Sequence, residues 1–313
     1  MKIVVTGAGG FVGRALIGRL LDAGHHVTGL DQAIDAMPAN RDCRLVIGDM
    51  GDAAVRAEAL DRGCDAIVHL ATVPGGAAER DPAASRRLNI DAMYDLLQEA
   101  SHIGDVPRIV YASSIAIFGD PLPAEGVDDR SVVAPRLVYG MHKAMMEIAV
   151  CSMSERLEID GVTLRLPGIV ARPKGPSGLK SAFMSDLFHA LRSDKAYVCP
   201  VSPGATIWAQ SVEQCVDNLI HALTVDAARL PRTRAVTLPA LRIRIDALIA
   251  EICRQCGSDP DKISYRPDVE LEAGFGRHPA LATPAARAAG FAHDGDIRSL
   301  VERALSYIAA NFP

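Results

Sequence analysis

The chain contains Lys2-Ile-Val-Val-Thr6 followed directly by Gly7-Ala-Gly-Gly-Phe-Val-Gly13. The first run is apolar and β-branched, which is typical of a buried strand, and residues 11–23 have the apolar period of a helix. Glycines between the two permit a tight turn, a close approach of the backbone to phosphate, and close packing of helix on strand. Because the free N–H groups at a helix start attract anions, this segment predicts a pyrophosphate-binding turn.

The rest of the first half alternates short strand-like runs with longer helix-like segments. This order is typical of parallel strands joined by crossover helices, and it predicts an α/β fold with a Rossmann-type doubly wound parallel sheet. We expect strands at 2–6, 26–30, 44–47, 66–70, 108–113 and 162–166, with helices at 11–23, 53–62, 83–102 and 136–157.

A Pro- and Gly-rich loop is predicted at 172–178, and the segments after it are mostly helix-like. Helices are expected at 181–191, 212–224, 245–256 and 296–311, with weak strands at 235–238 and 262–265. We therefore predict an NAD-binding Rossmann domain over 1–170, to which 208–238 returns. Residues 171–207 and 239–313 then form a smaller, mostly helical C-terminal substrate lobe.

Composition limits the classes of partner. The chain has 313 residues, of which 49% are hydrophobic and 23% charged, so a globular fold is expected. A formal net charge of -5 argues against binding of nucleic acid or an anionic membrane surface. We find no secretory signal pattern and no run approaching the roughly 20 apolar residues of a membrane span. These features favour a small-molecule substrate and a cytoplasmic location.

Cysteine spacing predicts neither a disulfide framework nor a metal site. Seven cysteines, an odd number, are scattered through mostly apolar segments. Cys253 and Cys256 have metal-ligand spacing, but no second Cys/His pair follows at zinc-site spacing.

Two acidic residues end expected strands on the cofactor side. Asp31 closes the second strand, where a carboxylate accepts hydrogen bonds from the adenosine ribose and repels a 2′-phosphate, so NAD is favoured over NADP. A neighbouring Arg14 or Arg41 accommodating a phosphate, and a simple turn aspartate, are the alternatives. Asp49 ends the third strand and either lies by the adenine or caps the next helix.

Tyr139-Gly-Met-His-Lys143 places a phenol and an ammonium on one helical face. A lysine close to a tyrosine favours the phenolate, so we expect the pKa of Tyr139 to fall toward the range of a general base. Ser114 ends the fifth strand and can hold the substrate oxygen for Tyr139. A surface tyrosine with a solvated lysine is the alternative, but the glycine turn, Asp31 and Ser114 in this order favour catalysis.

These motifs resemble the extended short-chain dehydrogenase/reductase family, which is NAD-dependent epimerase/dehydratase-like, over nearly the whole chain. The resemblance implies catalysis by Ser114, Tyr139 and Lys143 and implies NAD as cofactor. It also implies a homodimer built on the helices at 83–102 and 136–157. The residues expected at the cofactor are Gly7, Gly10, Phe11, Val12, Gly13, Asp31, Asp49, Met50, Leu70, Ala71, Thr72, Asn89, Tyr139, Lys143, Pro167 and Ile169.

Within that family the sequence is most similar to D-erythronate dehydrogenases, through residues 113–123, Leu164-Arg-Leu-Pro167 and Arg172-Pro173. The implied reaction is NAD-linked oxidation of a secondary alcohol of a small sugar acid to the oxo acid. A sugar acid carries a carboxylate, for which Arg172 offers a planar fork, a solvated hinge arginine being the alternative. Residues expected at the substrate are Pro74, Ser114, Ile115, Arg172 and Phe183; single aromatics such as Phe183 and Trp208 are alternatively core.

Three departures from that group fall around the expected substrate pocket, at Pro74, Gly168 and residues 178–180. The main alternative activity is a nucleotide-sugar epimerase that retains NAD, although Val170-Ala-Arg-Pro173 lacks the Tyr-Gly-Pro turn of those enzymes. A threonine-type amino-alcohol dehydrogenase is a nearer alternative. A redox-sensing protein that only binds the dinucleotide has no need of Tyr139 and Lys143 on one helical face.

Overall fold

The computed structural model of the chain describes residues 1–34, 40–174 and 180–312. The loop predicted at 172–178 is described only as far as Lys174, and the departure at 178–180 lies largely outside the described residues.

The centre of the molecule is a seven-stranded sheet with the order β10-β6-β5-β4-β1-β2-β3. Every neighbouring pair in it is parallel. This order confirms the predicted doubly wound sheet, and its direction reverses between β1 and β4, where such sheets bind ligands. The strands are β1 (Lys2–Thr6), β2 (His26–Asp31), β3 (Cys43–Ile47), β4 (Ala66–His69), β5 (Arg108–Ser114), β6 (Asp160–Leu166) and β10 (Ala235–Thr237).

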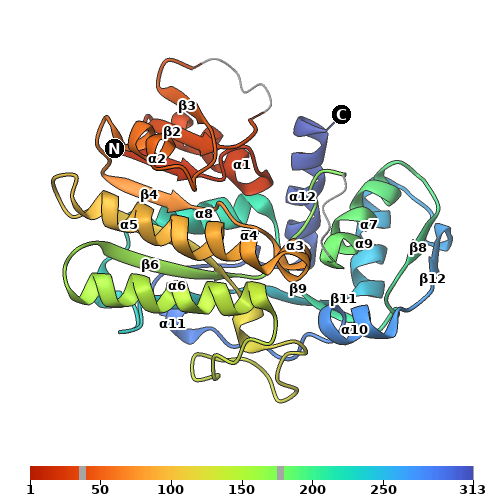
Figure 1. Cartoon of the computed structure of the whole chain (residues 1–313). Helices are drawn as coiled ribbons and strands as arrows, with labels where there is room; N and C mark the ends of the chain where they lie inside the picture. The colour runs from red at the N-terminus through yellow and green to blue at the C-terminus, as the bar shows by residue number, and fades with distance from the viewer. Residues whose placement is uncertain (35–39, 175–179, 313) are drawn as a thin grey trace.

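Helices cover both faces of this sheet (Figure 1). One buried cluster joins the strands to α1 (Phe11–Asp22), α8 (Val212–Ala222) and α11 (Pro284–Ala288). A second cluster joins the other face to α2 (Ala53–Leu60), α5 (Met93–Ser101) and α6 (Val138–Glu155). The helix predicted at 83–102 is formed by α4 (Pro82–Arg86), a π-helical turn (Arg87–Ala92) and α5.

A smaller lobe has its own hydrophobic core and two small sheets. One sheet consists of β11 (Leu241–Arg244), β9 (Thr206–Gln210) and β7 (Gly168–Ile169), and the other of β12 (Ile263–Tyr265) and β8 (Tyr197–Cys199). Its helices are α7 (Phe183–Arg192), α9 (Ile245–Cys256), α10 (Val269–Phe275) and α12 (Ile297–Asn311). In Figure 1 this lobe lies to the right of the large sheet.

The two lobes are closely joined. Only Pro167 separates β6 of the large sheet from β7 of the small one. Phe11 at the start of α1 packs edge-on against Tyr307 of α12, with ring centres 5.5 Å apart. The carboxyl ends of the large sheet therefore face the smaller lobe across a short distance, which is the arrangement that forms the cleft described below.

The strands predicted in the first half are confirmed within two residues at each end. The short strands β7, β8, β9 and β11 and the short helices α3 (Gly75–Arg80), α10 and α11 were not predicted. None of the helices in the described part of the chain combines the length and the hydropathy needed to cross a membrane.

Candidate active site

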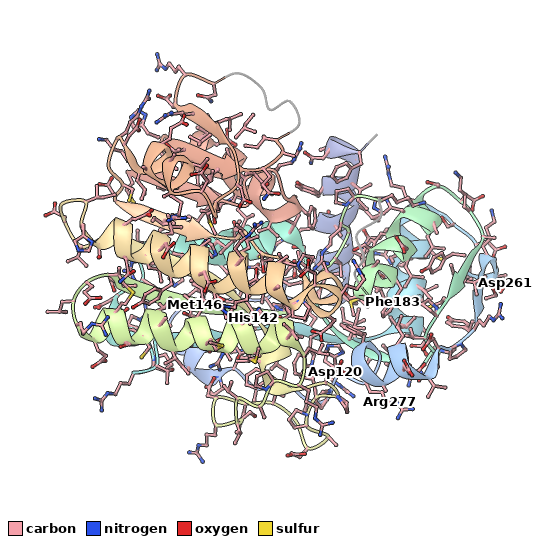
Figure 2. The ribbon with its side chains drawn as sticks, viewed as in Figure 1. Asp120, His142, Met146, Phe183, Asp261 and Arg277 are labelled. Atoms are coloured by element: carbon pink, nitrogen blue, oxygen red, sulfur yellow. The ribbon has the colours of Figure 1, made fainter. Side chains whose placement is uncertain are left out.

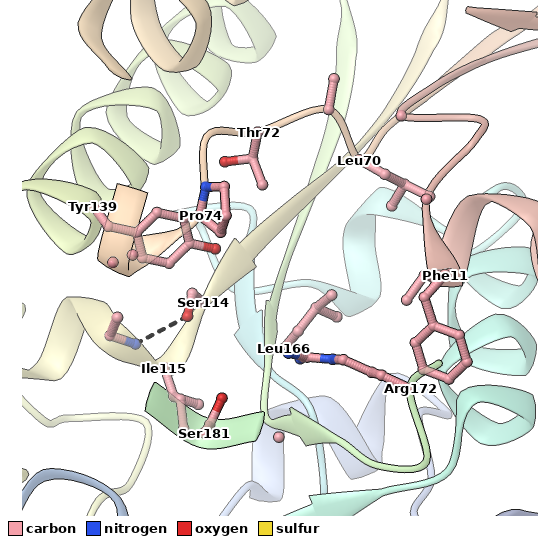
Figure 3. Close-up of a pocket in the computed structure, with 18 of the residues that line it drawn as sticks. Phe11, Leu70, Thr72, Pro74, Ser114, Ile115, Tyr139, Leu166, Arg172 and Ser181 are labelled. Atoms are coloured by element: carbon pink, nitrogen blue, oxygen red, sulfur yellow. Dashed lines mark hydrogen bonds between the residues drawn. The ribbon is translucent and has the colours of Figure 1, made fainter. Parts of the chain in front are cut away.

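A cleft with a volume of about 680 Å³ follows the carboxyl edge of the large sheet. The glycine turn and Asp31 line one part of it. Ser114, Tyr139 and Arg172, which Figure 3 labels, line another. The expected residues Gly10, Phe11, Val12, Gly13, Met50, Leu70, Ala71, Thr72, Pro74, Ile115 and Pro167 also line this cleft.

The glycine turn fits a pyrophosphate. Gly7 has a φ of +72°, and its N–H donates to the Leu30 carbonyl at 2.9 Å. A Cβ on Gly13 would lie 2.1 Å from the Gly7 carbonyl oxygen, so a side chain there would push α1 away from the strand. The helix start and its free N–H groups can lie this close to the cleft only because both positions are glycine.

Asp31 is fixed by backbone groups beside this turn. Its Oδ2 accepts from Gly9 N at 2.9 Å and its Oδ1 accepts from Gln32 N at 2.7 Å. The carboxylate therefore holds the turn and also presents negative charge to the cleft. This arrangement fits a ribose diol and disfavours a 2′-phosphate at the same position.

Asn89 and Asp49 lie behind the cleft wall. Asn89 is 3% exposed. Its Oδ1 accepts from Val73 N at 2.7 Å, and its Nδ2 donates to Val73 O at 3.0 Å. Asp49 accepts from Gly51 N at 2.8 Å and pairs with Arg87, while Asp52 is the residue that caps α2. Both side chains shape the wall of the cleft without lining it.

The structure brings Ser114, Tyr139 and Lys143 together. Ser114 ends β5, while Tyr139 and Lys143 lie one turn apart on α6. The Lys143 Nζ donates to the Ala112 carbonyl at 2.7 Å and lies 5.6 Å from the centre of the Tyr139 ring. With Pro167 and Ile169, the three side chains line a smaller hollow that adjoins the main cleft.

The expected fall in the pKa of Tyr139 is wrong for this structure. Burial raises the pKa of Tyr139, and hydrogen bonding to Ser114 and the charge of Arg172 only partly oppose it. Burial also lowers the pKa of the neighbouring Lys143 ammonium to about 7, and the charge of Glu147 opposes that fall. The degree of burial, which residue spacing does not reveal, decides the direction of the pKa shift of Tyr139.

A buried ion pair holds α6 against two strands behind this site. The Arg165 Nη2 of β6 lies 2.8 Å from Glu147 Oε2, and both side chains are about nine-tenths buried, at 11% and 7% exposed. The Ser113 hydroxyl of β5 donates to the same carboxylate. Because Glu147 lies one turn after Lys143 on α6, these contacts fix where Tyr139 and Lys143 lie relative to Ser114 at the end of β5.

Arg172 points into the cleft near Leu166 and Phe11 (Figure 3). Its backbone is held by Ser185 Oγ and His189 Nε2. Its guanidinium has no hydrogen bond or ion pair among the described residues, and burial lowers its pKa. A partly buried guanidinium without a counter-charge favours the binding of an anion in the cleft.

Phe183 lies elsewhere. It is 3% exposed and packs in the core of the smaller lobe, where Figure 2 labels it. Its neighbours Ser181 and Met184 line the cleft instead. Trp208 is likewise fully buried, and its Nε1 donates to the Pro279 carbonyl at 2.8 Å.

Sequence motifs missed several residues of the cleft wall. Glu79 of α3 lines the cleft, and its carboxylate lies 3.4 Å from Tyr139 N at the start of α6. Asp120 and the segment 274–278 line the cleft as well. The segment carries no motif and reaches the site only through tertiary contacts, such as Thr206 N donating to Gly276 O at 2.7 Å.

The low pKa of Lys143 predicts how stability depends on pH. Between about pH 7 and the ordinary lysine value of 10.5, the unfolded chain holds a proton that the folded protein has released. Raising the pH through this range therefore stabilises the fold. From pH 7 to pH 9, the free energy of urea unfolding of the wild type should rise by about 1–2 kcal/mol relative to Lys143→Met. Parallel curves for the two proteins would contradict the assigned burial of the ammonium.

Comparisons with known proteins agree with this geometry. The sequence profile of the NAD-dependent epimerase/dehydratase family matches residues 3–208. A D-erythronate dehydrogenase from Cupriavidus necator is 32% identical over 96% of this chain and 97% of its own length. A D-erythronate dehydrogenase from Haemophilus influenzae is 28% identical over 98% of this chain and 99% of its own.

The solved structures include a similar fold. A nucleoside-diphosphate-sugar epimerase from Agrobacterium tumefaciens superposes with a TM-score of 0.88 at 27% identity, covering 99% of this chain and 94% of its own. The structural match supports the predicted fold, and the family match and the relatives support the predicted cofactor. The chain belongs to the NAD-dependent epimerase/dehydratase family, and its cofactor is NAD.

Proposed function

We propose that the protein is a dehydrogenase that oxidises a secondary alcohol of a small sugar acid, such as D-erythronate, to the oxo acid. The observation that carries the proposal is the meeting of Ser114 and Tyr139 in one cleft with Arg172, a cation whose guanidinium has no partner among the described residues. The Cupriavidus and Haemophilus relatives, which are named for oxidation of D-erythronate, support this substrate class.

In this proposal Gly7, Gly10, Gly13 and Asp31 hold NAD, which when bound supplies the hydride acceptor. Ser114 donates to the substrate hydroxyl and turns its proton toward Tyr139. Tyr139 Oη takes that proton as general base. Since burial raises the pKa of Tyr139, the phenolate needs nearby positive charge, which Arg172 provides together with hydrogen bonding to Ser114.

Arg172 is proposed to bind the substrate carboxylate. Its guanidinium is the partly buried cation that the described structure leaves without an acidic partner in the cleft. A carboxylate can accept two parallel hydrogen bonds from an arginine fork, which orients the rest of a short acid. Glu79 and Asp120, which also line the cleft, repel a carboxylate from their own positions and leave it to Arg172.

The activity test measures NADH formation with NAD and a panel of four- to six-carbon sugar acids. We expect turnover with D-erythronate or a close relative, and a loss in kcat of about 100-fold or more in Tyr139→Phe. Tyr265→Phe, at an exposed tyrosine on β12, is the matched control and should retain activity. If no acid reduces NAD while the purified protein retains bound dinucleotide, the epimerase alternative replaces this proposal.

The carboxylate role of Arg172 predicts a specific kinetic pattern. Arg172→Met should raise KM for the acid by about 10–100-fold, as expected for loss of a charge-assisted hydrogen bond, with little change in KM for NAD. The exposed Arg136→Met serves as control. A rise in KM for NAD instead would assign the guanidinium to the cofactor phosphates.

A homodimer is also proposed. Met141, Met145 and Ile148 form an exposed apolar stripe along α6, and Tyr94 is exposed on neighbouring α5. Figure 1 shows these two helices side by side on one face of the molecule. Such a stripe fits burial against the same surface of a second copy. A monomer mass by light scattering would remove the proposal.

A further inference from the structure

His278 lines the cleft but has no part in the chemistry above. It follows α10 and is 4% exposed. The cleft wall around it includes Gly274 and Phe275. The sequence has no motif around His278, so only its contacts in the structure indicate a role.

The backbone of His278 is tied to the small sheet. Its N–H donates to the Thr206 carbonyl at 3.0 Å. Its own carbonyl accepts from Thr206 Oγ1 at 2.8 Å and from Arg242 Nε at 2.9 Å. The imidazole also packs edge-on against Trp208, with ring centres 5.0 Å apart. The ring is thus held in place by the protein itself before any ligand binds.

These contacts also set which ring nitrogen carries hydrogen. His278 Nδ1 lies 3.2 Å from the Thr206 carbonyl oxygen, which can only accept, so Nδ1 is the donor. Burial lowers the pKa of His278 to about 4, outweighing the Thr206 hydrogen bond, and the charge of Arg242 acts in the same direction as burial. The ring is therefore neutral at neutral pH, and Nε2 is an acceptor.

The Nε2 atom has no hydrogen-bond partner within the residues that the structure describes. Nε2 is not among the fully enclosed side-chain atoms that lack a partner in the described residues, so it remains accessible to water or to a ligand in the cleft. A carboxylate cannot donate, whereas an alcohol hydroxyl can. The chemistry of Nε2 therefore matches a hydroxyl-bearing part of a ligand.

Contacts of Trp208 connect His278 with the part of the cleft wall that holds Ser114 and Pro167. Trp208, its stacking partner, packs in one cluster with Ile115. The Trp208 carbonyl oxygen lies 2.9 Å from where a Cβ on Gly168 would be. Ile115 and Gly168 both line the cleft, beside Ser114 and Pro167 respectively. Trp208 therefore contacts His278 through its ring and Gly168 through its backbone carbonyl, and its side chain shares a cluster with Ile115.

We infer that His278 Nε2 accepts a hydrogen bond from a substrate hydroxyl other than the one that is oxidised. The site then selects polyhydroxy acids over monohydroxy acids of the same chain length. This inference rests on the proposed dehydrogenase function and adds the feature that determines its substrate class. A site built to bond a hydroxyl disfavours analogues that lack it, because its own polar atom is left unpaired.

The test compares kcat/KM for D-erythronate with kcat/KM for 2-hydroxybutanoate and 3-hydroxybutanoate, which keep the carboxylate and one carbinol. His278→Asn places an amide nitrogen near Nδ1, so it keeps the donor to Thr206 and loses the acceptor. His278→Gln places an amide oxygen near Nε2 and keeps an acceptor there. We expect the preference for D-erythronate to fall by about 3–10-fold in His278→Asn and to recover in His278→Gln.

The outcomes separate the two levels of the proposal. Equal losses for all three acids in His278→Asn, with the preference unchanged, overturn the role of His278 and leave the dehydrogenase standing. Absence of turnover by the wild type with every acid overturns the dehydrogenase itself, and this inference with it.

A binding readout is independent of turnover. Trp208 is the single tryptophan of the chain and touches His278, so its fluorescence should report a ligand that bonds Nε2. With NAD absent, D-erythronate should half-saturate the wild type and His278→Gln at a concentration several-fold lower than His278→Asn. The same half-saturation in all three proteins contradicts the inference.

Discussion

Lys143 is buried where α6 crosses the carboxyl end of β5, and its ammonium donates to the Ala112 carbonyl. Burying a cation at this point is costly, and the surrounding structure compensates for it. Glu147 lies one turn along the helix and opposes the loss of charge, while Arg165 and Ser113 hold Glu147 in place. The same contacts align the helix with the two strands. They therefore determine both the packing of α6 and the position of Tyr139 beside Ser114.

Burial also governs the charge states of the residues that line the cleft. Burial lowers the pKa of Lys143 and of Arg172 and raises that of Tyr139, so burial opposes the charged form of each group. An anionic substrate changes this balance because it gives Arg172 a counter-charge. A short hydroxy acid brings that anion and the reacting alcohol together in one molecule, which is why the account favours such an acid.

The large sheet was predictable because its signals are local. β-Branched runs, a glycine turn and a strand-terminal Asp31 each act within a few residues, and the structure has the strands within two residues of their expected ends. Spacing alone also placed Ser114, Tyr139 and Lys143 around one site. The pKa of Tyr139 was not predictable, because it depends on how much protein surrounds the phenol and not on which residues lie near it in sequence.

The substrate side was less predictable for a related reason. Phe183 and Met184 are neighbours on α7 and both pack in the lobe core, yet only Met184 also lines the cleft, a difference that helix orientation decides. His278 reaches the cleft through bonds to Thr206, which lies 72 residues earlier in the chain. Asn89 lies in a π-helical turn, and its amide binds the backbone of Val73 in the cleft wall. No sequence pattern predicts such a turn.

The most direct measurement of the central claim is thermal unfolding of the NADH-bound protein with D-erythronate or erythritol. Neither alcohol can reduce NADH, so both bind without reacting, and they differ chiefly in the carboxylate. If Arg172 binds the carboxylate, D-erythronate raises Tm and erythritol at the same concentration leaves it nearly unchanged. Equal shifts from both compounds would contradict this binding, because the cleft would then recognise hydroxyl groups without needing the anion that Arg172 is proposed to bind.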